Sequence, residues 1–303
     1  MSVKMLAQAL HLPESTAEMA VACLASGGHL LIEGPPGTGK SRLCEGIAKG
    51  FDLPIKRIQG TPDLMPMDLT GSEILNADGS RSFRPGPIFS PFVQVDEINR
   101  ISPRALSSVL EAMQERAVTV GDHRHNLPST FHVLATRSMR ESEGVYSLPE
   151  AVLDRFMVSL RLSLPDHEAE MASASGASVE LARGCLGSLE ELQERCRRQP
   201  CSERLARRAV DCTRLTRDDP GLRLGAGVRG GQHLVAVAKS LSVLRGERSA
   251  TLQALHDAAL PVLSHRLRPG IFDDESTRSH VERAWSAADP AAALDRMFAR
   301  FLS

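Results

Sequence analysis

The sequence contains one segment that dictates much of its architecture: Gly34-Pro35-Pro36-Gly37-Thr38-Gly39-Lys40-Ser41. This segment matches the phosphate-loop pattern G-x-x-x-x-G-K-[ST] at every specified position. The apolar residues 29–32 before it predict a β-strand, and residues 41–48 after it predict a helix. Because strand, glycine-rich turn and helix follow in the order that the pattern requires, we interpret residues 34–41 as a phosphate-binding loop rather than a chance glycine-rich turn.

The residue types in this loop indicate its chemistry. Its glycines allow backbone N–H groups to approach phosphate oxygens, and the start of the following helix favours negative charge. Lys40 is expected to reach the β- and γ-phosphates, and Ser41 to provide a hydroxyl group to Mg²⁺. We therefore predict that the loop binds ATP or ADP together with magnesium.

A second, acidic element is required, and Asp96-Glu97 follows an apolar strand pattern at residues 92–95. Asp96 is predicted to hold the Mg²⁺ coordination sphere, partly through water. Glu97 is predicted to orient the attacking water or accept its proton. An exposed acidic strand end is the alternative interpretation. The adjacent acids favour ATP over GTP, and the sequence lacks the guanine-reading pattern N-K-x-D.

The first half of the chain alternates strand and helix patterns. Strands are predicted at residues 29–32, 54–58, 92–95, 131–135 and 156–160. Such alternation indicates βαβ units and a mainly parallel five-stranded sheet covered by helices. Asp78-Gly79 and Gly121-Asp122 predict two projecting hairpins, at about 72–90 and 117–130. Gln94 is unexpected in a buried strand, and the sequence does not indicate a partner for its side chain.

The helix after the third strand has a clear predicted start. Ser102 can cap it, and Pro103 suits its first turn. Its buried stripe is predicted at Leu106, Val109, Leu110 and Met113.

Strand patterns end at about residue 166, where Ala, Arg, Leu and Glu become dominant. We therefore predict a nucleotide-binding αβα domain at 1–166, a linker at 167–187 and a helical domain at 188–303.

The net charge of −1 and the aromatic content of 4% supply neither a basic field nor a stacking platform for nucleic acid. Arginines between 195 and 217 are interpreted as a solvated helix face or a ring interface. No apolar run approaches the ~20 residues that a membrane helix needs. Polar residues interrupt the N-terminal segment, so no signal peptide is expected. We expect a cytoplasmic protein without membrane insertion, whose six scattered cysteines stay reduced.

Several motifs together resemble the MoxR family of AAA+ ATPases, densely over residues 28–167 and more loosely over 213–268. They are the phosphate loop, Arg57-Ile58-Gln59-Gly60-Thr61-Pro62-Asp63-Leu64-Met65-Pro66, Asp96-Glu97-Ile98-Asn99-Arg100, Leu110-Glu111-Ala112-Met113-Gln114-Glu115 and Leu148-Pro149-Glu150-Ala151-Val152-Leu153-Asp154-Arg155-Phe156. The resemblance implies a P-loop NTPase (AAA+) αβα sandwich, followed by a smaller all-helical lid domain. It also implies a homo-oligomeric ring, expected to be a hexamer.

Two further arginines gain a role from this resemblance. Arg155 matches the arginine that enters the ATP site of a neighbouring subunit, and a structural contact with Asp154 is the alternative. Arg229 matches the sensor 2 arginine, which reaches the γ-phosphate from the lid; a surface arginine at the start of a helix is the alternative. Residues 225–230 also fit G-x-G-x-x-G, but no strand is predicted before them, which argues against a dinucleotide site.

One motif departs from the family. After the fourth strand the family has Ala-Thr-Gln-Asn-Pro, whereas this chain has Ala135-Thr136-Arg137-Ser138-Met139. Ser138 therefore replaces the asparagine that orients the attacking water, a contact worth roughly 3 kcal/mol by analogy with a single oxyanion donor. We expect slow hydrolysis, unless Thr136 or Arg137 compensates.

The resemblance implies an ATP-hydrolysing, chaperone-like motor that remodels, matures or assembles a client complex. It also implies a partner with a von Willebrand factor A domain. The alternative is an ATP-dependent scaffold or switch that hydrolyses ATP slowly or not at all because of Ser138. A nucleic-acid remodeller is disfavoured by the near-zero net charge.

Overall fold

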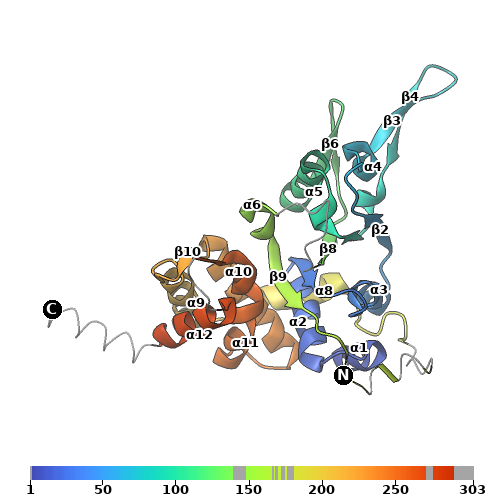
Figure 1. The fold of residues 1–303 in the computed structure, drawn as a ribbon. Helices are drawn as coiled ribbons and strands as arrows, with labels where there is room; N and C mark the ends of the chain where they lie inside the picture. Colours follow the sequence, from blue (N-terminus) through green and yellow to red (C-terminus); the bar gives the residue numbers. More distant parts are fainter. Residues whose placement is uncertain are drawn as a thin grey trace. The chain divides into compact units, whose positions relative to one another are not determined.

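A computed structural model describes residues 2–138, 148–165, 167, 170–171, 175, 181–270 and 276–289 (Figure 1). The chain divides into two compact units. The first consists of Met1–Phe156 and Leu160–Leu192, and the second of Met157–Ser159 and Gln193–Ser303. The predicted linker at 167–187 falls partly outside the described ranges.

A five-stranded sheet with the spatial order β2-β5-β8-β1-β9 belongs to the first unit, apart from Met157–Ser159 of β9. Its strands are β1 (His29–Glu33), β2 (Ile55–Gln59), β5 (Phe92–Asp96), β8 (His132–Arg137) and β9 (Phe156–Arg161). Parallel pairing joins β2 to β5, β5 to β8 and β8 to β1. The central strands are buried along their length, as their continuous apolar runs predict. The predicted parallel sheet is thus confirmed.

Helices cover both faces of this sheet. They are α1 (Ser2–Leu10), α2 (Glu14–Ala25), α3 (Lys40–Phe51), α4 (Pro66–Thr70), α5 (Pro103–Glu115) and α6 (Glu150–Leu153), with 3-10 turns η1 (Pro87–Phe89) and η2 (Ile98–Arg100). Alternate strand residues point to opposite faces. Val93 and Val95 pack with α5 in one apolar core, whereas Gln94 and Asp96 face the side where α3 begins. The result is the αβα sandwich.

The start and the buried face of helix α5 follow from its local sequence. The Ser102 side chain accepts a hydrogen bond from the Ala105 backbone N–H at 3.4 Å, so the predicted cap is confirmed. Three of the four predicted stripe residues are buried, while Leu110 is only partly buried at the core margin.

Two antiparallel hairpins extend away from the sheet (Figure 1). The first pairs β3 (Gly71–Leu75) with β4 (Arg81–Pro85), and the second pairs β6 (Ala117–Val120) with β7 (His123–Asn126). The first hairpin ends earlier than predicted, because η1 follows it. Phe83 and His125 stack across the two hairpins with ring centroids 3.9 Å apart. The hairpins are therefore packed on each other.

The second unit is mainly helical, which confirms the predicted lid. Its helices are α9 (Glu203–Leu215), α10 (Val228–Leu244), α11 (Leu252–Leu263), η3 (Ser264–Arg266) and α12 (Thr277–Ala287), while α8 (Leu189–Arg198) contains the boundary between the units. A short antiparallel ribbon of β10 (Leu222–Leu224) and β11 (Arg268–Pro269) was not predicted, because two or three residues are too few to show alternation.

The expectation that no strand precedes residues 225–230 was therefore wrong. β10 does so, but it pairs antiparallel with β11 rather than forming a parallel βαβ unit. The context that a dinucleotide fingerprint needs is still missing.

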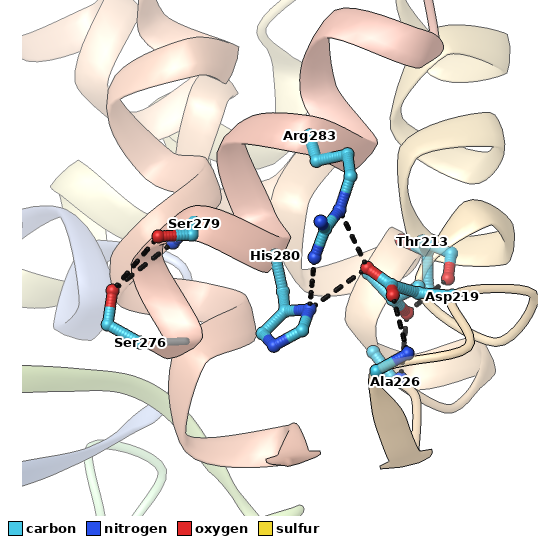
Figure 2. A network of polar contacts seen from close by, with 9 residues as sticks. Thr213, Asp219, Ala226, Ser276, Ser279, His280 and Arg283 are labelled. Atoms are coloured by element: carbon cyan, nitrogen blue, oxygen red, sulfur yellow. Dashed lines mark hydrogen bonds and ion pairs between the residues drawn. The ribbon is translucent and has the colours of Figure 1, made fainter. Parts of the chain in front are cut away.

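A polar network holds the turn between α9 and α10 against α12 (Figure 2). Asp219 accepts a hydrogen bond from the Gly221 backbone N–H at 3.0 Å. Its Oδ2 lies 3.0 Å from His280 Nδ1 and 3.2 Å from Arg283 Nε. Burial raises the pKa of Asp219, but the contacts with His280, Gly221 and Arg283 outweigh burial and hold it below its usual range. The ionised carboxylate therefore stabilises the turn that leads into α10.

We expect Asp219→Asn to lower the free energy of unfolding of the second unit by about 1 to 3 kcal/mol, because charged hydrogen-bond partners lose their anion. Hydrogen exchange of the α12 amides, read beside urea unfolding, measures this effect. Since the folded pKa is lowered, the contribution is complete above about pH 4 and is lost as the pH falls further. Asp218→Asn, at an exposed neighbour, is the matched control. Equal effects of the two variants would contradict this assignment.

Candidate nucleotide-binding site

Three glycines shape the loop at residues 34–41. Gly37 and Gly39 have φ angles of 84° and 82°, a left-handed conformation that other residues adopt only at a cost. A Cβ atom on Gly34 would lie 2.4 Å from the Leu162 carbonyl oxygen, so the close approach of β1 and the segment after β9 requires glycine there. Within the described residues, no atom lies within 4 Å of a Cβ built on Gly37 or Gly39. The loop thus offers an open cradle that fits phosphate oxygens.

Lys40 begins α3 and its side chain folds back into the loop. Its Nζ donates hydrogen bonds to the carbonyl oxygens of Gly34 and Pro35, each at 2.7 Å. Burial lowers the pKa of Lys40, while the carboxylates of Asp96 and Glu97 partly raise it. Because phosphate oxygens are stronger acceptors than carbonyl oxygens, this cation can transfer its bonds to a bound phosphate.

Asp96 ends β5 and is buried beside the loop. Its Oδ1 lies 3.5 Å from the Ser41 hydroxyl, at the long limit of a hydrogen bond. The two residues predicted to hold Mg²⁺ therefore lie next to each other. A hydroxyl and a carboxylate are oxygen donors of the kind that Mg²⁺ prefers, and magnesium commonly keeps several waters, so one carboxylate suffices.

Strand alternation and register bring further side chains to Asp96. Gln94 lies two residues before it on the same face, and its Nε2 donates to both carboxylate oxygens at 3.0 Å. The partner that the sequence did not indicate for Gln94 is thus Asp96. Arg57 is the register partner of Gln94 on β2, and its Nε pairs with Asp96 Oδ2 at 2.6 Å. Thr136 on β8 donates to Asp96 Oδ1 at 3.0 Å.

Glu97 adopts a left-handed backbone conformation, with φ of 52°. Such a conformation costs about 1 to 3 kcal/mol in a residue other than glycine, and it often marks functional sites. The Glu97 backbone N–H donates to the Thr136 hydroxyl at 3.1 Å, which holds the turn. Arg100 Nη1 donates to Glu97 Oε2 at 2.8 Å, and 39% of the Glu97 side chain is exposed. A carboxylate at this strand end can meet water next to the loop.

The end of β8 contains Thr136 and Arg137, the two residues suggested as compensation for Ser138, and they contact different acids. Arg137 pairs with Glu33 on β1 at 3.2 Å, so it contacts a different acid from the predicted catalytic pair. Thr136 is the residue that contacts Asp96 and the Glu97 backbone. Ser138 follows β8 directly, and its predicted role toward water stays a prediction.

The two predicted arginines lie in different units. Arg155 follows α6, and its Nη2 donates to Gln114 Oε1 on α5 at 2.6 Å. Its Nε is buried and has no hydrogen-bond partner among the residues that the structure describes. Arg229 lies in the first turn of α10, in the second unit. Both assigned roles stay predictions.

Sequence reasoning missed the residues that contact the acidic pair, which are Arg57, Gln94, Arg100 and Thr136. Period-two alternation places Gln94 beside Asp96 and could have identified it. The Arg57 contact depends on β2 lying next to β5, which the sequence does not reveal. In the described part of the chain, no group of three or more His, Cys, Asp or Glu residues could hold a metal ion. No helix there is long and apolar enough to span a membrane.

Comparison with known proteins agrees with this geometry. Residues 29–158 match the ATPase family associated with various cellular activities (AAA), and residues 214–284 match the AAA lid domain. The uncharacterized protein YeaC of Bacillus subtilis is 35% identical over 256 residues, which are 82% of this chain and 80% of that protein. Chaperone MoxR1 of Mycobacterium tuberculosis is 35% identical over 259 residues, 80% of this chain and 68% of that protein. The chain belongs to the MoxR family of AAA+ ATPases.

A solved structure supports the fold of this MoxR-family protein. A protein from Cytophaga hutchinsonii matches with a TM-score of 0.83 and 30% sequence identity, over 94% of this chain and 91% of that protein. The P-loop AAA+ fold and its helical lid are thereby confirmed, and with them ATPase membership and the general use of nucleotide and Mg²⁺ by this family.

Proposed function

We propose that this MoxR-family protein is an ATP-hydrolysing motor that remodels, matures or assembles a client protein complex. The observation that carries the proposal is the convergence of Lys40, Ser41, Asp96 and Glu97 at one end of the sheet, with Ser41 and Asp96 in reach of each other. The relative named chaperone MoxR1 supports the client-remodelling part.

Each residue has a separate task in this mechanism. The loop amides and Lys40 hold the phosphates, as Lys40 moves its hydrogen bonds from the Gly34 and Pro35 carbonyls to phosphate oxygens. Ser41 and Asp96 would hold Mg²⁺, which would supply positive charge to neutralise the phosphate oxygens. Glu97 orients the attacking water, and the hydrogen bond from Arg100 helps to hold the Glu97 side chain in place.

The assembled ring completes the site. We propose that the subunits form a homo-oligomer, expected to be a hexamer, in which Arg155 of one subunit stabilises the transferring phosphoryl group in the next. Arg229 would contribute a second cation from the lid. The paired hairpins project away from the sheet, where they can contact a client (Figure 1). A partner with a von Willebrand factor A domain and a cytoplasmic location belong to the same proposal.

The second candidate is a nucleotide-dependent scaffold with little or no hydrolysis. Ser138 favours it, because a serine hydroxyl is shorter than the asparagine amide that the family places there. Thr136 does not replace that group directly, because its hydroxyl is already bonded to Asp96 and to the Glu97 N–H.

Steady-state ATP turnover of the assembled protein, compared with Glu97→Gln, distinguishes these functions. A motor requires the Glu97 carboxylate, so we expect the variant to lose at least about 10²-fold in turnover, the lower end of general-base contributions, while keeping ATP binding. Glu45→Gln removes the same charge from an exposed position on α3 and should turn over like the wild type. If the wild-type ring is no faster than Glu97→Gln, the scaffold is correct and the motor is excluded.

A further inference from the structure

Protein side chains fully engage the Asp96 carboxylate. A carboxylate offers about four lone-pair directions. Gln94 Nε2 uses both oxygens, Thr136 takes Oδ1, and Arg57 takes Oδ2 at 2.6 Å, the shortest of these contacts. Ser41 approaches Oδ1 at the longer distance of 3.5 Å. A magnesium coordination sphere can use this carboxylate only if one of the present partners gives way.

Exposure distinguishes the partner that can leave. Gln94 and Thr136 are 1% and 2% exposed and fixed within the sheet, so moving either would leave a buried polar group without its partner. The Arg57 side chain is 60% exposed, while that of Asp96 is 7% exposed. A guanidinium at the surface regains water when it leaves a carboxylate, so its departure costs little. Arg57 is therefore the displaceable partner.

Arg57 and magnesium compete for the Asp96 carboxylate, because both are cations. Arg57 neutralises a nearly buried carboxylate, and the magnesium that arrives with a nucleotide is a second cation drawn to the same group. Two cations that share one carboxylate weaken each other's binding, both by occupying its oxygens and by mutual repulsion.

We infer that Arg57 is a positioning residue that acts through Asp96, as a counterion that magnesium must displace. The guanidinium pairs with the carboxylate and helps to orient it beside Ser41. When magnesium and nucleotide bind, the Arg57 side chain moves into solvent. Arg57 therefore sets the Mg²⁺ concentration that nucleotide binding requires. This inference rests on the proposed function, because it assumes that residues 34–41 bind a magnesium nucleotide.

The test uses the full chain with Arg57→Gln, and with Lys56→Gln as the matched control. Lys56 is the preceding residue on β2, is exposed, and points to the opposite face of the strand. ADP affinity is measured calorimetrically over a series of Mg²⁺ concentrations. We expect Arg57→Gln to lower the Mg²⁺ concentration at half-maximal enhancement of ADP binding by about threefold to tenfold. Lys56→Gln should leave that concentration unchanged.

Thermal unfolding without nucleotide supplies a second readout. Arg57→Gln should unfold at a lower temperature than Lys56→Gln, because Asp96 loses its counterion, and saturating Mg²⁺–ADP should narrow that difference. Arg57→Lys keeps the charge and should stay near the wild type in its Mg²⁺ requirement. If Arg57→Gln fails to fold, Arg57→Met, which also removes the charge, takes its place with the same expected decrease in the Mg²⁺ requirement.

The outcomes separate this inference from the proposed function. If wild-type protein binds no ADP at any Mg²⁺ concentration, the proposed function fails. If it binds ADP but Arg57→Gln requires as much Mg²⁺ as Lys56→Gln, or more, displacement of Arg57 is wrong while the proposed function stands.

Discussion

Lys40→Ala is expected to weaken ATP and ADP binding by about 10²- to 10⁴-fold. A hydrogen bond to a charged group contributes about 1.5 to 3 kcal/mol, and Lys40 is expected to make two such bonds to phosphate. In the structure its Nζ already donates to two loop carbonyls at 2.7 Å, so the cation is held inside the loop before a ligand arrives. Isothermal titration calorimetry with ADP measures the loss.

Lys49→Ala is the control for this experiment. Lys49 lies in the last turn of the same helix, so the variant makes the same change in charge and helix propensity away from the loop. ADP affinity should stay close to that of the wild type. If Lys40→Ala and Lys49→Ala bind ADP with equal affinity, the loop does not bind phosphate through Lys40, and the proposed function is wrong.

Arg155→Ala is expected to lower ATP turnover by about 10³- to 10⁵-fold while nucleotide affinity stays within a few-fold of the wild type, as for an arginine supplied in trans. Mixing it with Glu97→Gln tests where Arg155 acts. In a ring of random composition, about a quarter of the interfaces would combine an intact Glu97 with an intact Arg155 from the neighbour, and turnover should partly return. A stable mixed ring without any recovery would show that Arg155 does not act between subunits.

The contact between Arg155 and Gln114 offers a sharper control. If Arg155 served only to hold α5 through this 2.6 Å hydrogen bond, Gln114→Ala would reproduce the defect. We expect Gln114→Ala to retain most of the turnover, because it releases the guanidinium without removing it. Thermal unfolding of both variants should show whether either change acts through stability.

The phosphate loop and the acidic strand end could be predicted because their chemistry is local. The glycine spacing at 34, 37 and 39 encodes a backbone shape, and each position is needed for a positive φ angle or a close approach. The cap at Ser102 is local in the same sense. The hairpins were also predictable, because Asp78-Gly79 and Gly121-Asp122 are turn sequences between extended segments.

The contacts of Asp96 with Arg57 and Thr136 could not be predicted, because they come from strands far apart in sequence. Strand periodicity identifies each strand but does not say which strands are neighbours. Only the sheet order places β8 between β1 and β5, so that Thr136 meets Asp96, and sets β2 beside β5, so that Arg57 meets it too.

The sequence by itself therefore predicted the nucleotide-binding chemistry, the five strands of the main sheet, the helices after the first and third of them, and the family. These depend on residue types at fixed short spacings, which restrict the backbone directly. The tertiary structure alone decided that Arg57 neutralises Asp96 and that Arg137 pairs with Glu33. Side chains from separate strands meet only after burial of apolar surface has selected the strand order, and that selection depends on the whole core rather than on any one segment.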